Sequence, residues 1–266
     1  MTRRIKIIGV GPGDPDQVTL EAVAAMRSVD YFLVTDKSGT VKQGMPDPLV
    51  RAREELLDRH LSAPARVVKV DDAPRERREE FTGTDAEYRA AVAAWHRARV
   101  ERYLAVLAEH PGDVGFLVWG DPAFYDSTIR VVDQIASELE VEVDVIPGIS
   151  SVQLLAARHR LVLHEVGQAL HVTTRRRLAE AVLPPPHGQG QDNVVVMLNR
   201  VVDLTGPELD LGDWSIWWGG NLGTREEELV AGTVGEVLPA IDEARVRLRE
   251  TSGWVMDIYL LRAPRR

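Results

Sequence analysis

Residues 5–15 of the chain read Ile-Lys-Ile-Ile-Gly-Val-Gly-Pro-Gly-Asp-Pro, and a segment with helical character follows from Val18. The apolar run Ile5–Val10 predicts a strand, and the glycines and prolines after it predict a tight turn. Glycine exposes backbone amides, and open α/β sheets bind ligands at the carboxyl ends of their strands. The stretch therefore predicts an α/β fold with a small-molecule site beside this first loop.

A dinucleotide-binding loop is one alternative for this stretch. Its fingerprint, G-x-G-x-x-G, needs a third glycine where this chain has Asp14, and two prolines remove amide donors that a phosphate would use. An NAD-dependent reductase also needs an acidic residue about 20 residues beyond the loop, and Asp36 lies near there. The missing glycine weakens the case for a dinucleotide site. A second alternative is an ordinary turn that binds no ligand.

Composition limits the class of protein. At 266 residues the chain can form one large domain or two modest ones, and its formal net charge of −9 argues against nucleic-acid binding. The absence of cysteine excludes disulfides, thiolate catalysis and cysteine-ligated metals, and we expect no metal ion at the site. No apolar run is long enough for a membrane span or a signal peptide. We therefore expect a cytoplasmic protein that contacts no membrane.

Short apolar, β-branched runs alternate with helix-like segments, which is typical of an α/β fold. The runs are Ile5–Val10, Tyr31–Val34, Val67–Val70, Gly115–Trp119, Val141–Ile146, Leu170–Thr173, Asn193–Leu198, Ser215–Trp218 and Trp254–Leu261. The orientation of the strands in the second half stays open. Residues 85–109 carry apolar and aromatic side chains near helical spacing, and such a stripe more often packs on a core than contacts a ligand.

One segment interrupts this alternation. Residues 184–191 read Pro-Pro-Pro-His-Gly-Gln-Gly-Gln and can continue neither a helix nor a central strand, which predicts a flexible surface loop or a short linker. Apolar strands flank it closely, so we place the main domain boundary earlier, at Pro147-Gly148. The expected domains are residues 1–147 and 148–266.

A second glycine-bearing loop follows the apolar run at 115–119. It reads Gly120-Asp121-Pro122 and leads into a helix, so a carboxylate stands at a strand end where glycine permits close approach. The alternative is an ordinary turn in which Asp126 or Ser127 caps the helix.

Two later loops have the same character. Residues 145–152 place Ser150 and Ser151 at the start of a helix, where backbone amides favour a polar or anionic group, although serine is also a preferred cap. Residues 217–227 close another strand with small residues, reading Gly-Gly-Asn-Leu-Gly at 219–223.

In order, the four loops resemble the signature of the tetrapyrrole methylases, the class III S-adenosylmethionine-dependent methyltransferases: G-x-G-P-G-D-P, G-D-P, P-G-x-S and a late N-L loop. Segments 93–96, 118–128, 156–160 and 253–262 are similar to the branch that methylates and deacetylates precorrin-5 on the oxygen-dependent route to cobalamin. The resemblance implies two α/β domains, a methyl donor in the trough between them, and a homodimer.

The resemblance also implies which residues meet S-adenosylmethionine, most of them through the backbone. They are Pro12, Gly120, Asp121, Phe124, Ser150, Ser151, Met197 and Leu222. Asp121 is the strongest side-chain candidate, since a carboxylate accepts hydrogen bonds from ribose hydroxyls, with a turn-forming role as its alternative. Met197 suits a core position equally well. The late loop departs from the family pattern at 219–222, where it reads Gly-Gly-Asn-Leu, so its contacts with the methyl donor stay open.

The implied reaction transfers the methyl group to a ring carbon of precorrin-5, giving precorrin-6A, acetate and S-adenosylhomocysteine. Positioning can accelerate the transfer, whereas acetate release needs an oriented water and a stabilised oxyanion. The candidates for that step are Asp14, Tyr125 and Asp126, with His164 further out. Each has an alternative role. Asp14 and Asp126 also suit helix caps, Tyr125 suits a core aromatic, and His164 suits a surface residue without a function.

The carboxylate-rich substrate needs cationic partners, which Arg158, Arg160 and the run Arg175–Arg177 can provide unless they are simply solvated. Two further functions remain open: a sibling methylase that acts on another precorrin or on uroporphyrinogen, and a catalytically silent tetrapyrrole carrier. Binding of the methyl donor separates enzyme from carrier.

Overall fold

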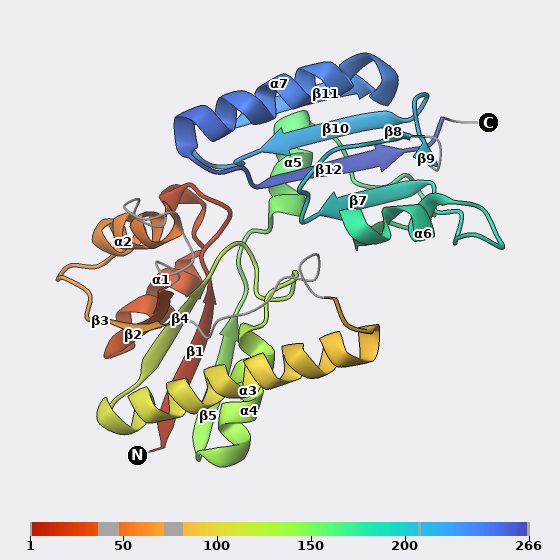
Figure 1. Cartoon of the computed structure of the whole chain (residues 1–266). Coiled ribbons are helices and arrows are strands. Elements are labelled where there is room, and N and C mark those ends of the chain that lie inside the picture. The colour runs from red at the N-terminus through yellow and green to blue at the C-terminus, as the bar shows by residue number, and fades with distance from the viewer. Residues whose placement is uncertain (1, 37–47, 72–81, 207–208, 265–266) are drawn as a thin grey trace. The chain divides into compact units, whose positions relative to one another are not determined.

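The computed structural model describes residues 2–36, 48–71, 82–206 and 209–264 (Figure 1). The chain divides into two compact units: unit 1 comprises Met1–Gly11 and Pro15–Ile149, and unit 2 comprises Pro12–Asp14 and Ser150–Arg266. The chain therefore enters unit 2 for three residues of the first glycine loop before it returns to unit 1. The domain boundary at Pro147-Gly148 stays a proposal.

Unit 1 is a parallel sheet covered on both faces. Its strands are β1 (Arg3–Gly9), β2 (Tyr31–Asp36), β3 (Val67–Asp71), β4 (Val114–Val118) and β5 (Val141–Ile146), in the order β3-β2-β4-β1-β5. Its helices are α1 (Leu20–Arg27), α2 (Pro48–His60), α3 (Asp85–Glu109) and α4 (Thr128–Glu138), with a 3₁₀ turn, η1, at Pro15–Gln17. Every residue of β4 is buried, as expected for a central parallel strand.

Alternation along β1 divides the core of unit 1 between the two faces. Ile5 and Ile7 pack with residues of α3 and α4, whereas Ile8 and Val10 pack with residues of α1 and α2. This period of two is the ordinary strand pattern and sets which helices cover each face (Figure 1). The carboxyl ends of the strands are left for the loops.

Unit 2 is built on a mixed sheet. Its strands are β6 (His171–Thr174), β7 (Asn193–Met197), β10 (Ser215–Gly220), β11 (Glu228–Thr233) and β12 (Asp257–Arg262), in the order β11-β10-β12-β7-β6. Its helices are α5 (Ser151–His159), α6 (Leu178–Val182) and α7 (Val234–Ser252), with a 3₁₀ turn, η2, at Arg175–Arg177 and a small hairpin of β8 (Thr205–Gly206) and β9 (Leu209–Asp210). The pair β6–β7 is parallel, and the other three pairs are antiparallel.

The predicted α/β fold is confirmed, and each of the nine apolar runs overlaps a strand. Strand β11 was not predicted, because its sequence, Glu-Leu-Val-Ala-Gly-Thr, offers little apolar area and includes a glycine. The orientation left open for the second half is mostly antiparallel. Helix α3 spans the predicted stripe, and Thr84 forms a capping box with Glu87 at its start. None of the helices within the described ranges is long and apolar enough to cross a membrane.

The proline- and glutamine-rich loop has more local structure than its composition indicates. The backbone amides of Gln189, Gly190 and Gln191 donate to the carbonyls of Glu180, Leu183 and Ala181, respectively. These bonds fold the segment back onto the end of α6 within unit 2.

Candidate active site

The loops after β1 and β4 are joined through their backbones. The amide of Gly120 donates to the carbonyl of Gly11 at 2.8 Å, and the amide of Gly11 donates back to the carbonyl of Gly120 at 3.2 Å. The two glycines form an isolated antiparallel bridge just beyond the parallel sheet. The first two glycine loops are therefore one structure at the carboxyl edge of unit 1, where α/β sheets bind ligands.

The loop after β5 packs onto the same point. A Cβ added to Gly148 would lie 2.2 Å from the carbonyl oxygen of Gly120, and one added to Gly9 would lie 2.5 Å from the amide nitrogen of Gly148. Close backbone approach, expected from the sequence at Gly120, thus also depends on Gly9 and Gly148, glycines of the first and third motifs for which the sequence did not predict this contact. Gly120 itself has φ +68°, and a Cβ there would meet nothing nearer than the Ile149 carbonyl at 4.0 Å.

This open side of Gly120 is the feature that fits a ligand. Gly120 is buried, and glycine leaves unfilled the space beside its Cα that a side chain would occupy. The arrangement suits a methyl donor that is held mainly by backbone contacts.

Asp121 connects two of these loops. Its Oδ1 accepts from the amide of Ala123 at 2.8 Å, and its Oδ2 accepts from the amide of Gly148 at 2.9 Å. The turn-forming role considered from the sequence is therefore present in the structure. Each carboxylate oxygen has two lone pairs, so these bonds do not exhaust its capacity to accept from a ligand.

The residues that follow Asp121 expose one aromatic ring and cap one helix. Tyr125 has φ 50° and is 48% exposed, so it is not a core aromatic. A non-glycine residue in this left-handed backbone conformation costs about 1–3 kcal/mol, and such residues are most frequent at functional sites. Asp126 Oδ1 accepts from the Thr128 amide at 2.6 Å, whereas Ser127, at the N-cap position of α4, makes no capping bond. Phe124 is half-buried in the same loop.

Pro12 and Asp14 belong to unit 2, where the first loop packs on the last one. A Cβ added to Gly13 would lie 2.9 Å from the carbonyl carbon of Gly223 and 3.0 Å from the carbonyl oxygen of Leu222. The Leu222 side chain is 4% exposed and covers Gly219, so it fills the core of unit 2.

Ser150, Ser151 and Met197 lie at element ends in unit 2. Ser150 is 2% exposed and forms a capping box with Gln153: its Oγ accepts from the Gln153 amide at 3.3 Å, and Gln153 Oε1 accepts from its amide at 2.8 Å. Ser151 opens α5 and Met197 closes β7, and both are half-buried. The capping alternative for Ser150 is therefore realised.

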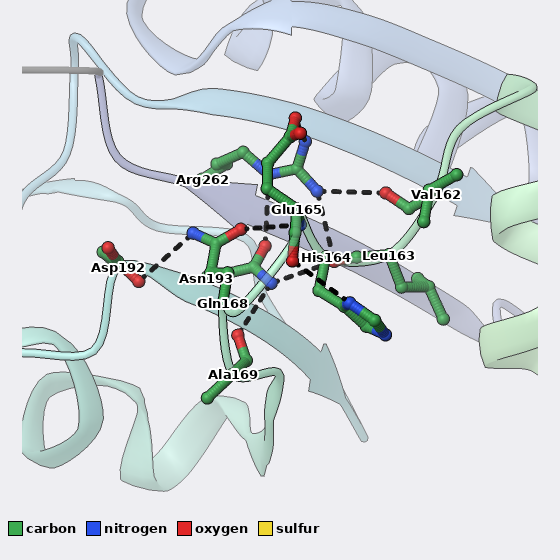
Figure 2. Close-up of polar contacts among 9 residues, drawn as sticks. All are labelled: Val162, Leu163, His164, Glu165, Gln168, Ala169, Asp192, Asn193 and Arg262. Atoms are coloured by element: carbon green, nitrogen blue, oxygen red, sulfur yellow. Dashed lines mark hydrogen bonds and ion pairs between the residues drawn. The ribbon is translucent and has the colours of Figure 1, made fainter.

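The structure separates His164 from Met197. His164 lies in the loop before β6, which Arg262 and Asn193 hold through bonds to the Leu163 carbonyl at 3.1 and 2.9 Å (Figure 2). Asn193 is the first residue of β7 and Met197 is the last, so the two mark opposite ends of the strand. His164 does not join the other candidates of unit 2.

Most of the arginines considered from the sequence have protein partners. Arg158 pairs with Glu227 at 2.6 Å, Arg175 donates to the Asp203 carbonyl at 2.5 Å, and Arg177 forms a fork on Glu180 at 2.5 and 2.9 Å. Arg160 ends α5 in a left-handed conformation, and Arg176 is exposed. Across the described part of the chain, no three His, Asp or Glu side chains gather as a metal-ligand set.

Known proteins share this combination of loops and sheets. The family model of the Tetrapyrrole (Corrin/Porphyrin) Methylases matches residues 4–238. Precorrin-6A synthase [deacetylating] from Sinorhizobium sp is 38% identical over 98% of this chain and 95% of its own length. A crystal structure from Corynebacterium diphtheriae, described as related to cobalamin synthesis (CobF), is 31% identical with a TM-score of 0.76, covering 98% of this chain and 99% of that one.

A more distant structure shares the fold. Uroporphyrin-III C-methyltransferase from Thermus thermophilus, solved with S-adenosylhomocysteine, is 20% identical with a TM-score of 0.53 and covers 97% of this chain and 91% of that one. Tetrapyrrole methylases are methyltransferases that use S-adenosylmethionine. The family model spans all four glycine loops, and the resemblance read from them is confirmed. The chain belongs to the tetrapyrrole (corrin/porphyrin) methylase family.

Proposed function

We propose that this protein is the S-adenosylmethionine-dependent C-methyltransferase that converts precorrin-5 to precorrin-6A with release of acetate. The observation that carries the proposal is its likeness to the Sinorhizobium precorrin-6A synthase over nearly the whole of both chains. Family membership sets aside the NAD-dependent reductase. A sibling methylase and a silent carrier stay as outcomes of the test below.

The proposed donor contacts lie in both units. In unit 1 they are Gly120, Asp121 and Phe124, and in unit 2 they are Pro12, Ser150, Ser151, Met197 and Leu222. The open side of Gly120 supports a contact through the backbone. When bound, S-adenosylmethionine supplies an electrophilic methyl group on sulfur. The chain's task is to hold the reacting groups in line and to exclude competing water, which requires no covalent enzyme intermediate.

Acetate release asks more of the side chains, because water must be oriented and an oxyanion stabilised. We propose Asp14, Tyr125 and Asp126 for this step. The exposed Tyr125 phenol supports a role as hydrogen-bond donor, and its left-handed backbone fixes where the ring begins. Asp126 already accepts the Thr128 amide through one oxygen, so its contribution would come from the other.

Replacing Asp121 with alanine is expected to weaken S-adenosylmethionine binding by about 10- to 100-fold. The change removes the acceptor of two backbone amides, and a hydrogen bond to a charged group is worth about 1.5–3 kcal/mol. Titration calorimetry measures the affinity, and Asp121→Asn, which keeps one carbonyl acceptor, should fall in between. Unchanged affinity in the alanine variant would remove Asp121 from the donor site.

Replacing Tyr125 with phenylalanine is expected to slow acetate release by at least about tenfold while methyl transfer continues. A positioned acid or base contributes about 10²–10⁴-fold, and the variant loses only the phenol. Single-turnover reactions that follow methyl label and acetate separately provide the measurement. A wild-type rate of acetate release would assign the hydroxyl no part in the reaction.

Incubation with methyl-labelled S-adenosylmethionine and enzymatically generated precorrin-5 tests the whole proposal. We expect labelled product and free acetate by mass spectrometry. Label without acetate would indicate a sibling methylase, and donor binding without label would indicate a different tetrapyrrole substrate. A protein that binds tetrapyrrole but no methyl donor would be a carrier.

We further propose that the protein is a cytoplasmic homodimer, as its resemblance to the family implies. Native mass spectrometry of the purified protein would give its mass directly, and a monomer at micromolar concentration would contradict this proposal.

A further inference from the structure

The first glycine loop returns to unit 1 through the 3₁₀ turn η1, and the end of helix α2 holds this turn. His60 is the last residue of α2, and its Nε2 lies 2.7 Å from the carbonyl oxygen of Pro15, the first residue of η1. A carbonyl oxygen can only accept, so Nε2 carries the hydrogen of this bond. The half-buried imidazole thus ties the chain directly after Asp14 to α2.

The rest of unit 1 fixes this imidazole in place. Leu56 and Leu57, about one turn earlier in α2, are buried in the same core cluster as Ile8 of β1. Arg27, the last residue of α1, donates through Nε and Nη2 to the carbonyl oxygen of His60 at 3.1 and 2.9 Å. Basic side chains commonly satisfy the last carbonyls of a helix in this way. His60 is therefore anchored by the core and by α1.

Close backbone packing connects η1 to the proposed donor site. A Cβ added to Gly11, which has φ +78°, would lie 2.9 Å from the carbonyl oxygen of Gln17, the last residue of η1. Gly11 also forms the two-bond bridge with Gly120, beside whose Cα the space is open. Backbone atoms meet at each step, and no flexible side chain absorbs a movement. A shift of η1 would therefore displace Gly11 and, through the bridge, Gly120.

We propose that His60 is a positioning residue of the methyl-donor site: its bond to Pro15 fixes η1, and η1 fixes the backbone of Gly11 and Gly120. The inference rests on the proposed contact between Gly120 and S-adenosylmethionine. In this role His60 acts through the loop and not on the reacting atoms. A displacement of about 1 Å that arises far from the chemistry can cost about 10²-fold in rate, so such a bond can matter.

Titration calorimetry with S-adenosylhomocysteine tests the proposal on the full chain. His60→Ala removes the hydrogen-bond donor and should weaken binding by about three- to tenfold, the range expected for one neutral hydrogen bond. His60→Gln, whose side-chain amide can donate in place of Nε2, should stay within about twofold of wild type. Rescue by glutamine would assign the effect to the bond to Pro15 and not to the imidazole ring.

Arg59 provides the matched control on the same helix. Its Nη2 donates to Asp16 Oδ1 of the same turn at 3.1 Å, but the two side chains are 62% and 68% exposed. Exposed ion pairs contribute little, so Arg59→Gln should bind S-adenosylhomocysteine within about twofold of wild type.

Steady-state kinetics separate positioning from a general loss of structure. In His60→Ala the KM for S-adenosylmethionine should rise by about three- to tenfold while the KM for precorrin-5 stays within about twofold. Parallel rises in both KM values would mark His60 as merely structural and overturn the proposal. So would a lower melting temperature with unchanged S-adenosylhomocysteine affinity, or an equal loss of affinity in His60→Gln.

The same measurements distinguish this proposal from the proposed reaction. If wild type binds S-adenosylhomocysteine, His60→Ala binds it weakly and wild type releases no acetate from precorrin-5, the positioning role stands and the reaction falls. If wild type releases acetate and His60→Ala binds the donor product as tightly as wild type, the reaction stands and the positioning role falls. A wild-type protein that binds no S-adenosylhomocysteine would overturn both.

Discussion

Replacing Gly148 with alanine is expected to destabilise unit 1 by about 3 kcal/mol and to weaken S-adenosylmethionine binding by more than about tenfold. The added Cβ would lie 2.2 Å from the Gly120 carbonyl oxygen and 2.8 Å from the carbonyl carbon of Gly9. Both neighbours are backbone atoms, so no side chain can move aside, and overpacking of this kind costs about 1–3 kcal/mol or more. Thermal unfolding should show a midpoint lower by roughly 6–12 °C.

Gly212 provides the matched control for this change. A Cβ added there would meet only the Oδ1 atom of Asp210, at 3.3 Å; this oxygen accepts from the Gly212 amide at 3.1 Å, and a shift of a few tenths of an ångström accommodates the methyl group. Gly212→Ala should therefore stay within about 0.5 kcal/mol of wild type, as surface substitutions usually do. If Gly148→Ala has the wild-type unfolding midpoint and S-adenosylmethionine affinity, the close packing of the loops after β1, β4 and β5 contributes to neither stability nor donor binding.

The contrast between Gly148 and Gly120 shows where prediction from sequence ends. The motifs identify glycine-bearing loops at strand ends, because periodicity locates the strands and glycine marks turns. They do not reveal which glycine touches which, since contacts between loops depend on strand order. Gly9 and Gly148 meet because β1 and β5 are neighbours in the sheet, although more than 130 residues separate them in the chain.

The stacked arginine of α3 was not predicted for a related reason. The apolar and aromatic stripe of α3 predicts packing on the core, and Tyr103 is indeed buried against Phe116, with ring centroids 5.5 Å apart. The same helix also carries Arg99, four residues from both Trp95 and Tyr103, and its guanidinium carbon lies 4.8 and 5.6 Å from the centroids of these two rings. An arginine at that spacing between two aromatics is a signal for stacking that periodicity of apolar residues alone does not register.

A buried ion pair in unit 2 gives a second large expected effect. Arg245 of α7 and Asp257 of β12 are 4% and 7% exposed and bond to each other. Asp257 Oδ2 also accepts from the Trp218 indole nitrogen at 3.0 Å, and Arg245 donates to the Arg200 carbonyl at 2.5 Å. Burial raises the pKa of the Asp257 carboxyl above its ordinary value, and the Arg245 guanidinium opposes that shift. Asp257 is the first residue of β12, so the ion pair fixes α7 to the amino-terminal end of this strand.

Replacing Arg245 with methionine is expected to destabilise the protein by about 3–5 kcal/mol, because it leaves a buried carboxylate without its counterion. Arg247→Met, on the same helix, breaks an ion pair with Glu228 in which the arginine is 54% exposed and should cost no more than about 1 kcal/mol. Adding Asp257→Asn to Arg245→Met removes the uncompensated charge and should restore part of the loss. Urea unfolding measures all three variants.

The pH dependence of the Arg245→Met variant supplies an independent check. Without the arginine, the pKa of the Asp257 carboxyl should rise further, because the largest of the influences that lower it has been removed and burial still raises it. A carboxyl whose pKa is higher in the folded than in the unfolded state favours folding at low pH, and this contribution is lost as pH rises through the folded pKa. The stability deficit relative to wild type should therefore be larger at pH 8 than at pH 5. A deficit that is equal at both values would mean that the carboxyl does not titrate in this range and that lost packing of Arg245 causes the destabilisation.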